Sequence, residues 1–271
     1  MSTPTFVTPE PFAAGQQITL GEDAAHHMRV RRLDVGTRVA LLNGQGTRGS
    51  GVLVRLARRN ATVEVGSAST ESPPRAVHLL LPVADKDRML WLAEKAAELG
   101  ASSWRPVQFR RSRSVASRGE GTMFTQKVAA RMTAAIEQSG SAWLPVIFPD
   151  ATIERAVAAA PQGIRVVLDA AGAPLARVDV GSAPPALVDG DGDVDIGERG
   201  GAEAAGGLSA QDAPAPVVIV VGPEGGIEAD ELALFTAAGF ATASIGKTIL
   251  RFETAAVAAL GIVQSLIAGE R

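Results

Sequence analysis

The 271-residue chain contains no cysteine and no tyrosine, and only 4% of its residues are aromatic. The absence of cysteine excludes a disulfide framework, a zinc site with thiolate ligands and any mechanism that uses a cysteine nucleophile. The first 15 residues lack the basic segment and apolar run of a signal peptide. No stretch has the roughly 18 uninterrupted apolar residues of a membrane span. We therefore expect a soluble cytoplasmic protein with no membrane partner, and the 46% of hydrophobic residues is enough for a proper core.

Lysine is also scarce, with four residues in the whole chain, so most of the positive charge is arginine. The net charge is −3, but residues 176–216 alone carry −6, which leaves +3 on the rest of the chain. Because local basic patches capture phosphates, the acidic total is no argument against a nucleic-acid partner. Arginine suits phosphate and base edges, although a GC-rich genome would also produce a chain rich in arginine and alanine.

The first 70 or so residues are expected to form a small β-barrel or sheet. Short apolar runs, separated by turn signals, lie at residues 38–42, 51–56 and 61–65. The stretch Glu71-Ser-Pro-Pro74 marks a boundary, because neither proline can continue a central strand. The sequence therefore predicts one domain over residues 1–73 and a second over residues 74–271.

The second part alternates apolar runs with segments of helical periodicity, which is typical of an α/β domain with a mostly parallel sheet. The predicted strands lie at residues 76–83, 104–109, 144–148, 164–168, 217–221 and 243–245. The predicted helices lie at residues 88–99, 123–139, 153–160, 228–238 and 253–268. In such a sheet, ligands bind at the carboxyl ends of the strands.

Residues 176–216 break this alternation, because they are rich in Gly, Ala, Asp and Pro and have no hydrophobic period. They are too long for an ordinary connection. Too little apolar surface is available there to offset the entropy of ordering the segment. We predict a disordered surface insertion.

Two motif-like stretches are better explained without a ligand. Gly44-x-Gly46-x-x-Gly49 fits a dinucleotide fingerprint, but a strand follows it where the fingerprint requires a helix, so a hairpin loop is expected. The acidic stretch at residues 189–193 resembles the start of a calcium-binding loop, but the required glycine is Val194 and the required glutamate is Gly200. No metal site is predicted.

A predicted strand ends directly in Gly222-Pro-Glu-Gly-Gly226, and the helix that follows begins with acidic residues. Glycines at such a place let a ligand approach the backbone closely. The acids already occupy the positive end of the helix, so a neutral or cationic ligand fits better than a phosphate. A tight turn without a ligand is the alternative.

The next predicted strand ends in a second loop, residues 245–250, ahead of the last helix. Arg251 and Glu253 flank the start of that helix. If the two strands are neighbours, one cation and one carboxylate lie beside the first loop. An ordinary ion pair at the helix start is the alternative.

Gly222-Pro-Glu-Gly-Gly226 followed by Ile249-Leu-Arg-x-Glu-Thr-Ala255 resembles the RsmE family of SPOUT-class RNA methyltransferases. The resemblance covers nearly the whole chain. Its other motifs, in chain order, are His26-x-x-x-Val30-x-Arg32-Leu33, Leu42-Asn-Gly-x-Gly46, Lys86-Asp-Arg-Met89, Glu94-Lys-Ala-x-Glu-Leu-Gly100, Arg110-Arg-Ser112 and Glu137-Gln-Ser-Gly140. The chain departs from the family pattern at Thr248 and Ser141, where the family usually has arginine, at Arg110, where it has an acid, and in its longer insertion.

The resemblance implies an N-terminal PUA-like β-barrel that binds RNA and a C-terminal SPOUT α/β domain with a trefoil knot. It also implies a homodimer, S-adenosylmethionine as methyl donor, and N3 of a uridine in 16S (small-subunit) ribosomal RNA as acceptor. That nitrogen becomes nucleophilic once it is deprotonated, so no cysteine adduct is needed. The enzyme must align the methyl group with N3 and stabilise the uridine anion.

The site residues follow from the same resemblance. Cofactor binding is assigned to Leu168, Val221, Gly222, Pro223, Glu224, Gly225, Gly226, Ile245, Gly246 and Leu250. Arg251 is expected to stabilise the uridine anion, and Glu224 or Glu253 to accept or relay the proton. The candidate phosphate contacts are Arg29, Arg31, Arg32, Arg88, Arg110, Arg111, Arg113 and Arg131.

Two other functions stay open at this point. The first is a non-catalytic RNA-binding assembly factor that has the PUA-like module and no activity, which the departures at Thr248 and Ser141 allow. The second is methylation of a ribose 2′-hydroxyl on the same fold class, to which the local motifs are less similar.

Overall fold

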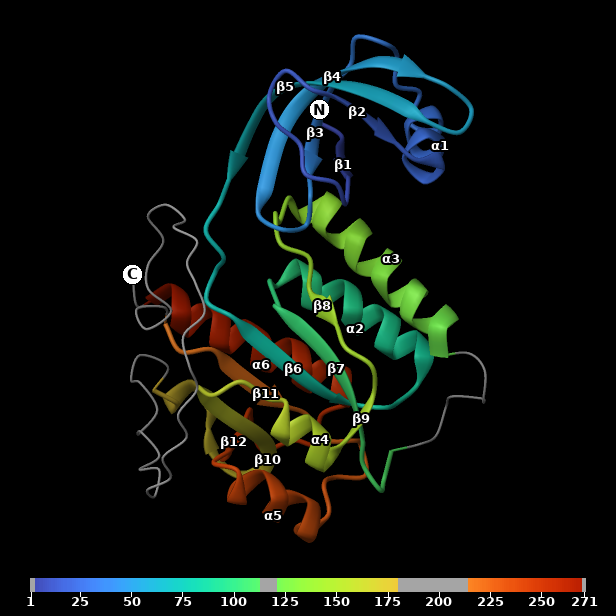
Figure 1. The fold of residues 1–271 in the computed structure, drawn as a ribbon. Coiled ribbons are helices and arrows are strands. Elements are labelled where there is room, and N and C mark those ends of the chain that lie inside the picture. The colour runs from blue at the N-terminus through green and yellow to red at the C-terminus, as the bar shows by residue number, and fades with distance from the viewer. Residues whose placement is uncertain (1–2, 113–120, 180–213, 270–271) are drawn as a thin grey trace, which may run out of the picture.

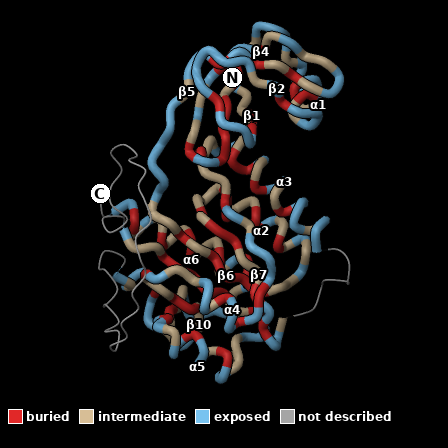
Figure 2. Tube along the Cα trace, in the orientation of Figure 1, coloured by how far each residue is buried: buried red, intermediate tan, exposed pale blue. Residues whose placement is uncertain are grey.

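The computed structural model describes residues 3–112, 121–179 and 214–269. The chain folds around two separate β-sheets, one drawn from residues 5–70 and the other from residues 77–244 (Figure 1). Residues 71–74 between them are exposed and contain no helix or strand (Figure 2). Both prolines of the predicted boundary lie in this connection, where they interrupt no strand.

The N-terminal sheet has five strands in the order β1-β3-β4-β5-β2. Their bounds are β1 Thr5–Val7, β2 Gln17–Leu20, β3 Arg38–Leu42, β4 Thr47–Leu56 and β5 Ala61–Thr70. β1 and β3 are parallel and the other pairs antiparallel. The three predicted strands are all present, two of them longer than predicted. The expectation of β-structure alone was wrong for α1 (Glu22–Val30), which buries Ala25 and Met28 in the core of this sheet.

The C-terminal sheet has seven strands, and every pairing in it is parallel. The order is β12-β10-β11-β6-β7-β8, and β9 also pairs with β7. Their bounds are β6 Val77–Pro82, β7 Ser103–Gln108, β8 Val146–Ile147, β9 Ala151–Thr152, β10 Ile164–Pro174, β11 Val217–Val220 and β12 Ala241–Ser244. The predicted parallel sheet is therefore confirmed.

Helices cover both faces of this sheet. They are α2 Lys86–Glu98, α3 Gly121–Ser139, α4 Ile153–Ala158, α5 Ala229–Ala237 and α6 Phe252–Gly269, with a short 3₁₀ turn η1 at Leu175–Arg177. In β11, Val217 and Ile219 face the core that contains α2, α3 and α6, whereas Val218 and Val220 face the core beneath α4 and α5. Successive residues of a strand point to opposite faces, which is why the run is apolar throughout.

Three predictions for this region need correction. The strand predicted at residues 144–148 is only two residues long, and β9 was not predicted. The insertion was expected to begin at residue 176, but the 3₁₀ turn η1 covers residues 175–177. The first residue of this turn, Leu175, is only 1% exposed and packs in the same core as α6. Residues 180–213 of the predicted insertion lie outside the described residues. The trefoil knot stays a prediction.

Helix α6 is long and apolar enough to span a membrane by length and composition, with a mean hydropathy of 1.5. The sequence criterion missed it because charged and polar residues interrupt the run. Seven of its residues are buried, and all of them except Glu253 belong to the core shared with α2 and β6, among them Ala256, Leu260 and Val263. This packing is that of a core helix of a globular domain.

The two sheets are joined by a direct contact between residues 43–46 and the segment after α3. Gly46 donates its N–H to the Ala142 carbonyl at 2.9 Å, and Leu144 donates to the Gly44 carbonyl at 2.9 Å. At the end of α3, Glu137 Oε1 accepts the Val7 N–H at 3.0 Å. The glycine-rich loop that mimics a nucleotide fingerprint is therefore a docking element between the two parts.

Candidate functional site

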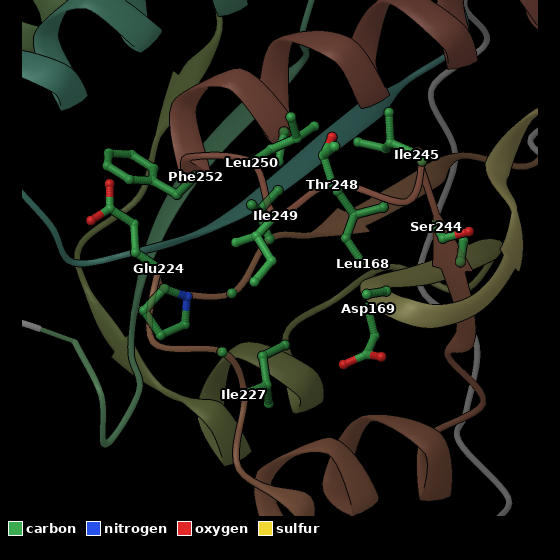
Figure 3. Close-up of a pocket in the computed structure, with 18 of the residues that line it drawn as sticks. Leu168, Asp169, Glu224, Ile227, Ser244, Ile245, Thr248, Ile249, Leu250 and Phe252 are labelled. Atoms are coloured by element: carbon green, nitrogen blue, oxygen red, sulfur yellow. The ribbon is translucent and has the colours of Figure 1, made fainter.

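A cavity of about 310 Å³ opens at the carboxyl ends of β11 and β12 and beside the middle of β10 (Figure 3). Its walls come from residues 168–170, from the loop after β11 and from the loop after β12. The pairing of β10 with β12 shifts register between Leu168 and Ala173, and the cavity lies at this break. All ten residues predicted to bind a cofactor line this one cavity, with Asp169, Thr248 and Phe252 among the further lining residues.

The glycines of the first loop fit a tight turn. Gly226 has φ +80°, in the left-handed region that side chains disfavour. Its N–H donates to the Pro223 carbonyl at 2.8 Å. A Cβ atom on Gly222 would lie 2.4 Å from Ile227 Cγ1, so a side chain there is excluded by the protein itself. The sequence predicts that these glycines leave room for a ligand, whereas the geometry shows that the turn itself already requires two of them.

The cavity lining carries negative charge only. Its described residues include the carboxylates of Asp169 and Glu224 but no lysine, arginine or histidine. The nearby start of α5 is closed by a capping box, in which Glu228 and Glu231 satisfy each other's N–H groups. A phosphate would therefore meet two acids and an occupied helix end, so the site suits a neutral or cationic ligand.

Three charged side chains meet at one end of the cavity. Arg88, in the first turn of α2, forms an ion pair with Glu224, and its Nε lies 3.9 Å from Glu253 Oε1. The Glu253 side chain is only 10% exposed, and its Oε2 has no hydrogen-bond partner among the described residues. Arg88 had been assigned to RNA. Sequence reasoning missed its position because it depends on how α2 and α6 pack together.

Of the three predicted catalytic residues, only Glu224 lines the cavity. Glu253 lies beside Arg88, as described above. Arg251 is exposed, and it lies between two lining residues, Leu250 and Phe252. Its carbonyl accepts the N–H of Ala255 at 2.9 Å, which begins α6, and its guanidinium has no ion pair within the described part of the chain. The Arg251 side chain is therefore available at the rim.

Two of the arginines expected to contact phosphate are paired with acids of α5. Arg110 contacts Asp230 and lies 2.6 Å from Glu228, and these hydrogen bonds, that to Asp230 above all, raise the pKa of Arg110. Arg111 lies 3.3 Å from Glu228 and donates to the Gly225 carbonyl at 2.6 Å. Both stay half exposed. Their contact with RNA remains a prediction.

The other candidate phosphate contacts are spread over both parts of the chain. Arg131 on α3 is 3.8 Å from Glu94. Arg29 donates to the Ala57 carbonyl at 2.8 Å, which ties α1 to the β4–β5 turn. Arg31 and Arg32 are exposed just after α1. Arg113 lies outside the described residues.

Several arginines lie at the end of the N-terminal sheet next to α1. Residues 29–59 contain eight arginines and a single acid, Asp34. The loop after α1 is held against β4 by the bond from the Gly36 N–H to the Leu53 carbonyl, at 2.8 Å. The arginines of α1, of this loop and of the β4–β5 turn therefore gather at one end of the sheet.

Two parts of the chain match the sequence models of known protein families. Residues 70–181 and 197–264 match the sequence model of the RNA methyltransferase domain. Residues 20–66 match that of the RNA methyltransferase PUA domain. The first match alone covers more than half of the chain, and it includes every residue that lines the cavity.

The chain is also similar in sequence to individual proteins of known name. The chain is 27% identical over 253 residues to the Ribosomal RNA small subunit methyltransferase E of Synechocystis sp., with 92% of this chain and 73% of the relative covered. It is 27% identical over 268 residues to the protein of the same name from Mycobacterium bovis, with 95% and 89% covered.

Solved structures share the fold over the full length. A Ribosomal RNA small subunit methyltransferase E from Neisseria gonorrhoeae, bound to S-adenosyl methionine, superposes with a TM-score of 0.80 at 23% identity, covering 98% of both chains. A probable rRNA methyltransferase from Porphyromonas gingivalis gives a TM-score of 0.71 at 25% identity, covering 99% of this chain and 100% of the other. With its fold, its cavity and both family matches in agreement, this chain belongs to the RNA methyltransferase family and carries that family's PUA domain at its N-terminal end.

Proposed function

We propose that this protein transfers a methyl group from S-adenosylmethionine to N3 of a uridine in 16S (small-subunit) ribosomal RNA. The observation that carries the proposal is the cavity at residues 222–226 and 245–250, with carboxylates and no basic group in its lining. Its relatives named Ribosomal RNA small subunit methyltransferase E support the substrate class, and the neighbour bound to S-adenosyl methionine supports the cofactor.

The lining residues fit S-adenosylmethionine by their chemistry. This cofactor is an adenosine with a sulfonium and an amino-acid tail, so it carries positive charge and no phosphate. Apolar walls from Leu168, Ile227 and Leu250 suit the adenine, and the turn backbone offers N–H and C=O groups for polar edges. Asp169, which has no ion pair among the described residues, suits a cation, whereas Glu224 is already paired with Arg88. A phosphate-bearing dinucleotide would meet the same carboxylates unfavourably.

The cofactor, when bound, supplies an activated methyl group on sulfur. The chain's own residues then have three tasks, which are to hold the uridine, to remove its N3 proton and to stabilise the anion that remains. Arg251 is exposed at the rim and has no competing ion pair among the described residues, so its guanidinium is available to the uridine anion. This assigns charge stabilisation to Arg251.

We assign the proton acceptor to Glu224 and a supporting role to Glu253. Glu224 lines the cavity and its side chain is 47% exposed, so it can reach both a bound base and solvent. Glu253 is buried beside Arg88 and does not line the cavity. Arg88 bridges the two carboxylates, which keeps Glu224 at the mouth of the site.

The PUA domain supplies the RNA surface in this proposal. The arginines at the α1 end of the N-terminal sheet are exposed and outnumber the acids beside them, of which Glu22 lies 3.9 Å from Arg59, and this excess of positive charge favours phosphate contacts that are not specific for sequence. We also propose a cytoplasmic location, because the proposed substrate is ribosomal RNA. Specificity then depends on which uridine can enter the cavity while the patch is occupied.

We also propose that the protein acts as a homodimer. Helix α6 presents a second apolar stripe, Ala258, Ile262 and Leu266, which the monomer buries only in part. A second copy of the chain would cover it. Sedimentation at several concentrations tests this, because Ala258→Arg should shift the species from dimer to monomer.

Calorimetric titration tests the cofactor first. S-adenosylmethionine should bind stoichiometrically, whereas NAD, which carries phosphates, should not bind measurably. Transfer of an isotope-labelled methyl group to small ribosomal subunits that lack the modification then tests the reaction. Cofactor binding without transfer to any ribosomal RNA would favour the non-catalytic RNA-binding protein instead.

A further inference from the structure

Arg111 lies outside the cavity but against the loop that forms one of its walls. Its Nη1 donates to the Gly225 carbonyl at 2.6 Å, and its Nε lies 3.3 Å from Glu228 Oε1. A Cβ atom on Gly225 would lie 3.2 Å from both Cβ and Cδ of Arg111. The space that the missing Gly225 side chain leaves open is therefore next to the stem of this arginine.

The backbone next to Arg111 is itself fixed. The Arg110 N–H donates to Glu231 Oε1 at 2.7 Å, and the other oxygen of Glu231 accepts the Glu228 N–H at 3.1 Å. Glu231 is only 4% exposed. This buried carboxylate joins the segment after β7 to the start of α5, so Arg111 approaches Gly225 from a rigid base.

We propose that Arg111 is a positioning residue of the cofactor loop. Its guanidinium fixes the Gly225 carbonyl while its stem covers the open side of Gly225, so the wall of the cavity keeps one conformation. The inference rests on the proposed function, because it takes this cavity to be the S-adenosylmethionine site. It assigns Arg111 a role distinct from the phosphate contact expected from sequence.

Arg110 is the matched control. It is the chain neighbour of Arg111, pairs with the same Glu228 and is similarly exposed, at 59% against 52% for the side chain. Its side chain makes no contact with Gly225 among the described interactions. A pure charge effect on α5 or on RNA would appear in both variants, whereas loop positioning would appear only at residue 111.

The test compares Arg111→Ala, Arg111→Lys and Arg110→Ala. We expect Arg111→Ala to weaken S-adenosylmethionine binding by about five- to twentyfold, since a half-exposed charge-assisted hydrogen bond is lost. Arg111→Lys should recover part of this affinity, and Arg110→Ala should stay within about twofold. In kinetics, KM for the cofactor should rise while kcat at saturating cofactor changes little.

Hydrogen exchange of the cofactor-free protein gives a second readout that does not depend on the cofactor's identity. The amides of residues 222–228 should exchange faster in Arg111→Ala, but not in Arg110→Ala. Unchanged exchange together with wild-type affinity in Arg111→Ala would overturn the inference, as would equal effects of the two variants. If the unmodified protein fails to bind S-adenosylmethionine, the proposed function falls, and the exchange data alone decide whether Arg111 positions the loop.

A double-mutant cycle adds a test of the stem contact. Gly225→Ala forces the new methyl group against Arg111, so it should weaken cofactor binding in the wild-type background. In the Arg111→Ala background the contact with Cδ is gone and only the Cβ atom, 3.2 Å away, remains, so the same change should cost less. Additive effects of the two substitutions would contradict the proposed contact.

Discussion

Two glycines of the N-terminal part share the same φ but differ in what a side chain would touch, and they allow the domain contact to be measured. Gly36 and Gly46 both have φ +94°. A Cβ atom on Gly36 would meet nothing within 4 Å. On Gly46 it would lie 2.4 Å from Trp143 Cζ2 and 3.0 Å from the Glu71 carbonyl oxygen. Gly46→Ala is therefore the perturbation, and Gly36→Ala is its control.

The backbone cost should be the same at both positions, about 1–2 kcal/mol for a side chain in the left-handed region. At Gly46 the clash with Trp143 adds a further cost of about 1–3 kcal/mol, typical of an overpacked contact. That ring is held between the two parts, and its Nε1 is buried without a partner among the described residues. The difference between the two variants thus isolates the contact itself.

Thermal unfolding followed by circular dichroism provides the assay. For a protein of this size each kcal/mol lowers Tm by about 2–4 °C, so Gly46→Ala should melt measurably below Gly36→Ala. Because residues 43–46 dock the basic N-terminal sheet onto the part that holds the cavity, Gly46→Ala should also raise KM for RNA more than it weakens cofactor binding. Equal melting temperatures for the two variants would refute this account of the contact.

Three further outcomes are expected. Arg251→Ala should slow methyl transfer roughly 100-fold in single-turnover experiments, with little change in RNA affinity, because it removes charge stabilisation only; a wild-type rate would reduce Arg251 to a helix-start residue. Gly225→Val should abolish cofactor binding in a folded protein, since the larger side chain meets Arg111. Calorimetry measures the cofactor affinity of this variant, and an unchanged affinity would contradict the prediction. Burial raises the pKa of Glu137 above its unfolded value, and the Val7 N–H, His27 and Arg31 oppose this with smaller effects. The stability that the protonated Glu137 side chain contributes is therefore present at low pH and is lost as pH rises through the folded pKa. The Tm of Glu137→Gln relative to wild type should therefore increase between about pH 4 and pH 7, and a decrease would contradict the sign.

The parallel sheet was predictable from sequence because its central strands β6 and β11 are largely apolar on both faces. Val217–Val220 is the clearest case, since its alternate residues serve two different cores. The N-terminal helix α1 was not predictable in the same way. Its stripe is short and includes His26 and His27, and tertiary packing of Met28 holds it in place. The two-residue strands β8 and β9 carry too little pattern to be recognised.

The cavity was predictable for a different reason. Two of its three walls are loops that follow strands directly, so chain order places them at one edge of a parallel sheet, and the third wall, residues 168–170, lies within β10. What surrounds the cavity was not predictable, because ion pairs such as Arg88–Glu224 and Arg110–Asp230 join residues more than one hundred positions apart. A lone arginine in a sequence gives no sign of which acid it will meet. That is why arginines assigned to RNA were found beside the cofactor loop.

Nucleoside mapping of the reaction product tests the central claim most directly. Small ribosomal subunits that lack the modification would be incubated with the protein and S-adenosylmethionine carrying a labelled methyl group, and their RNA would be digested and analysed by mass spectrometry. The account predicts one labelled nucleoside, a uridine methylated at N3, in a single position of the 16S RNA. Label on a ribose 2′-hydroxyl, or no label despite bound cofactor, would contradict it.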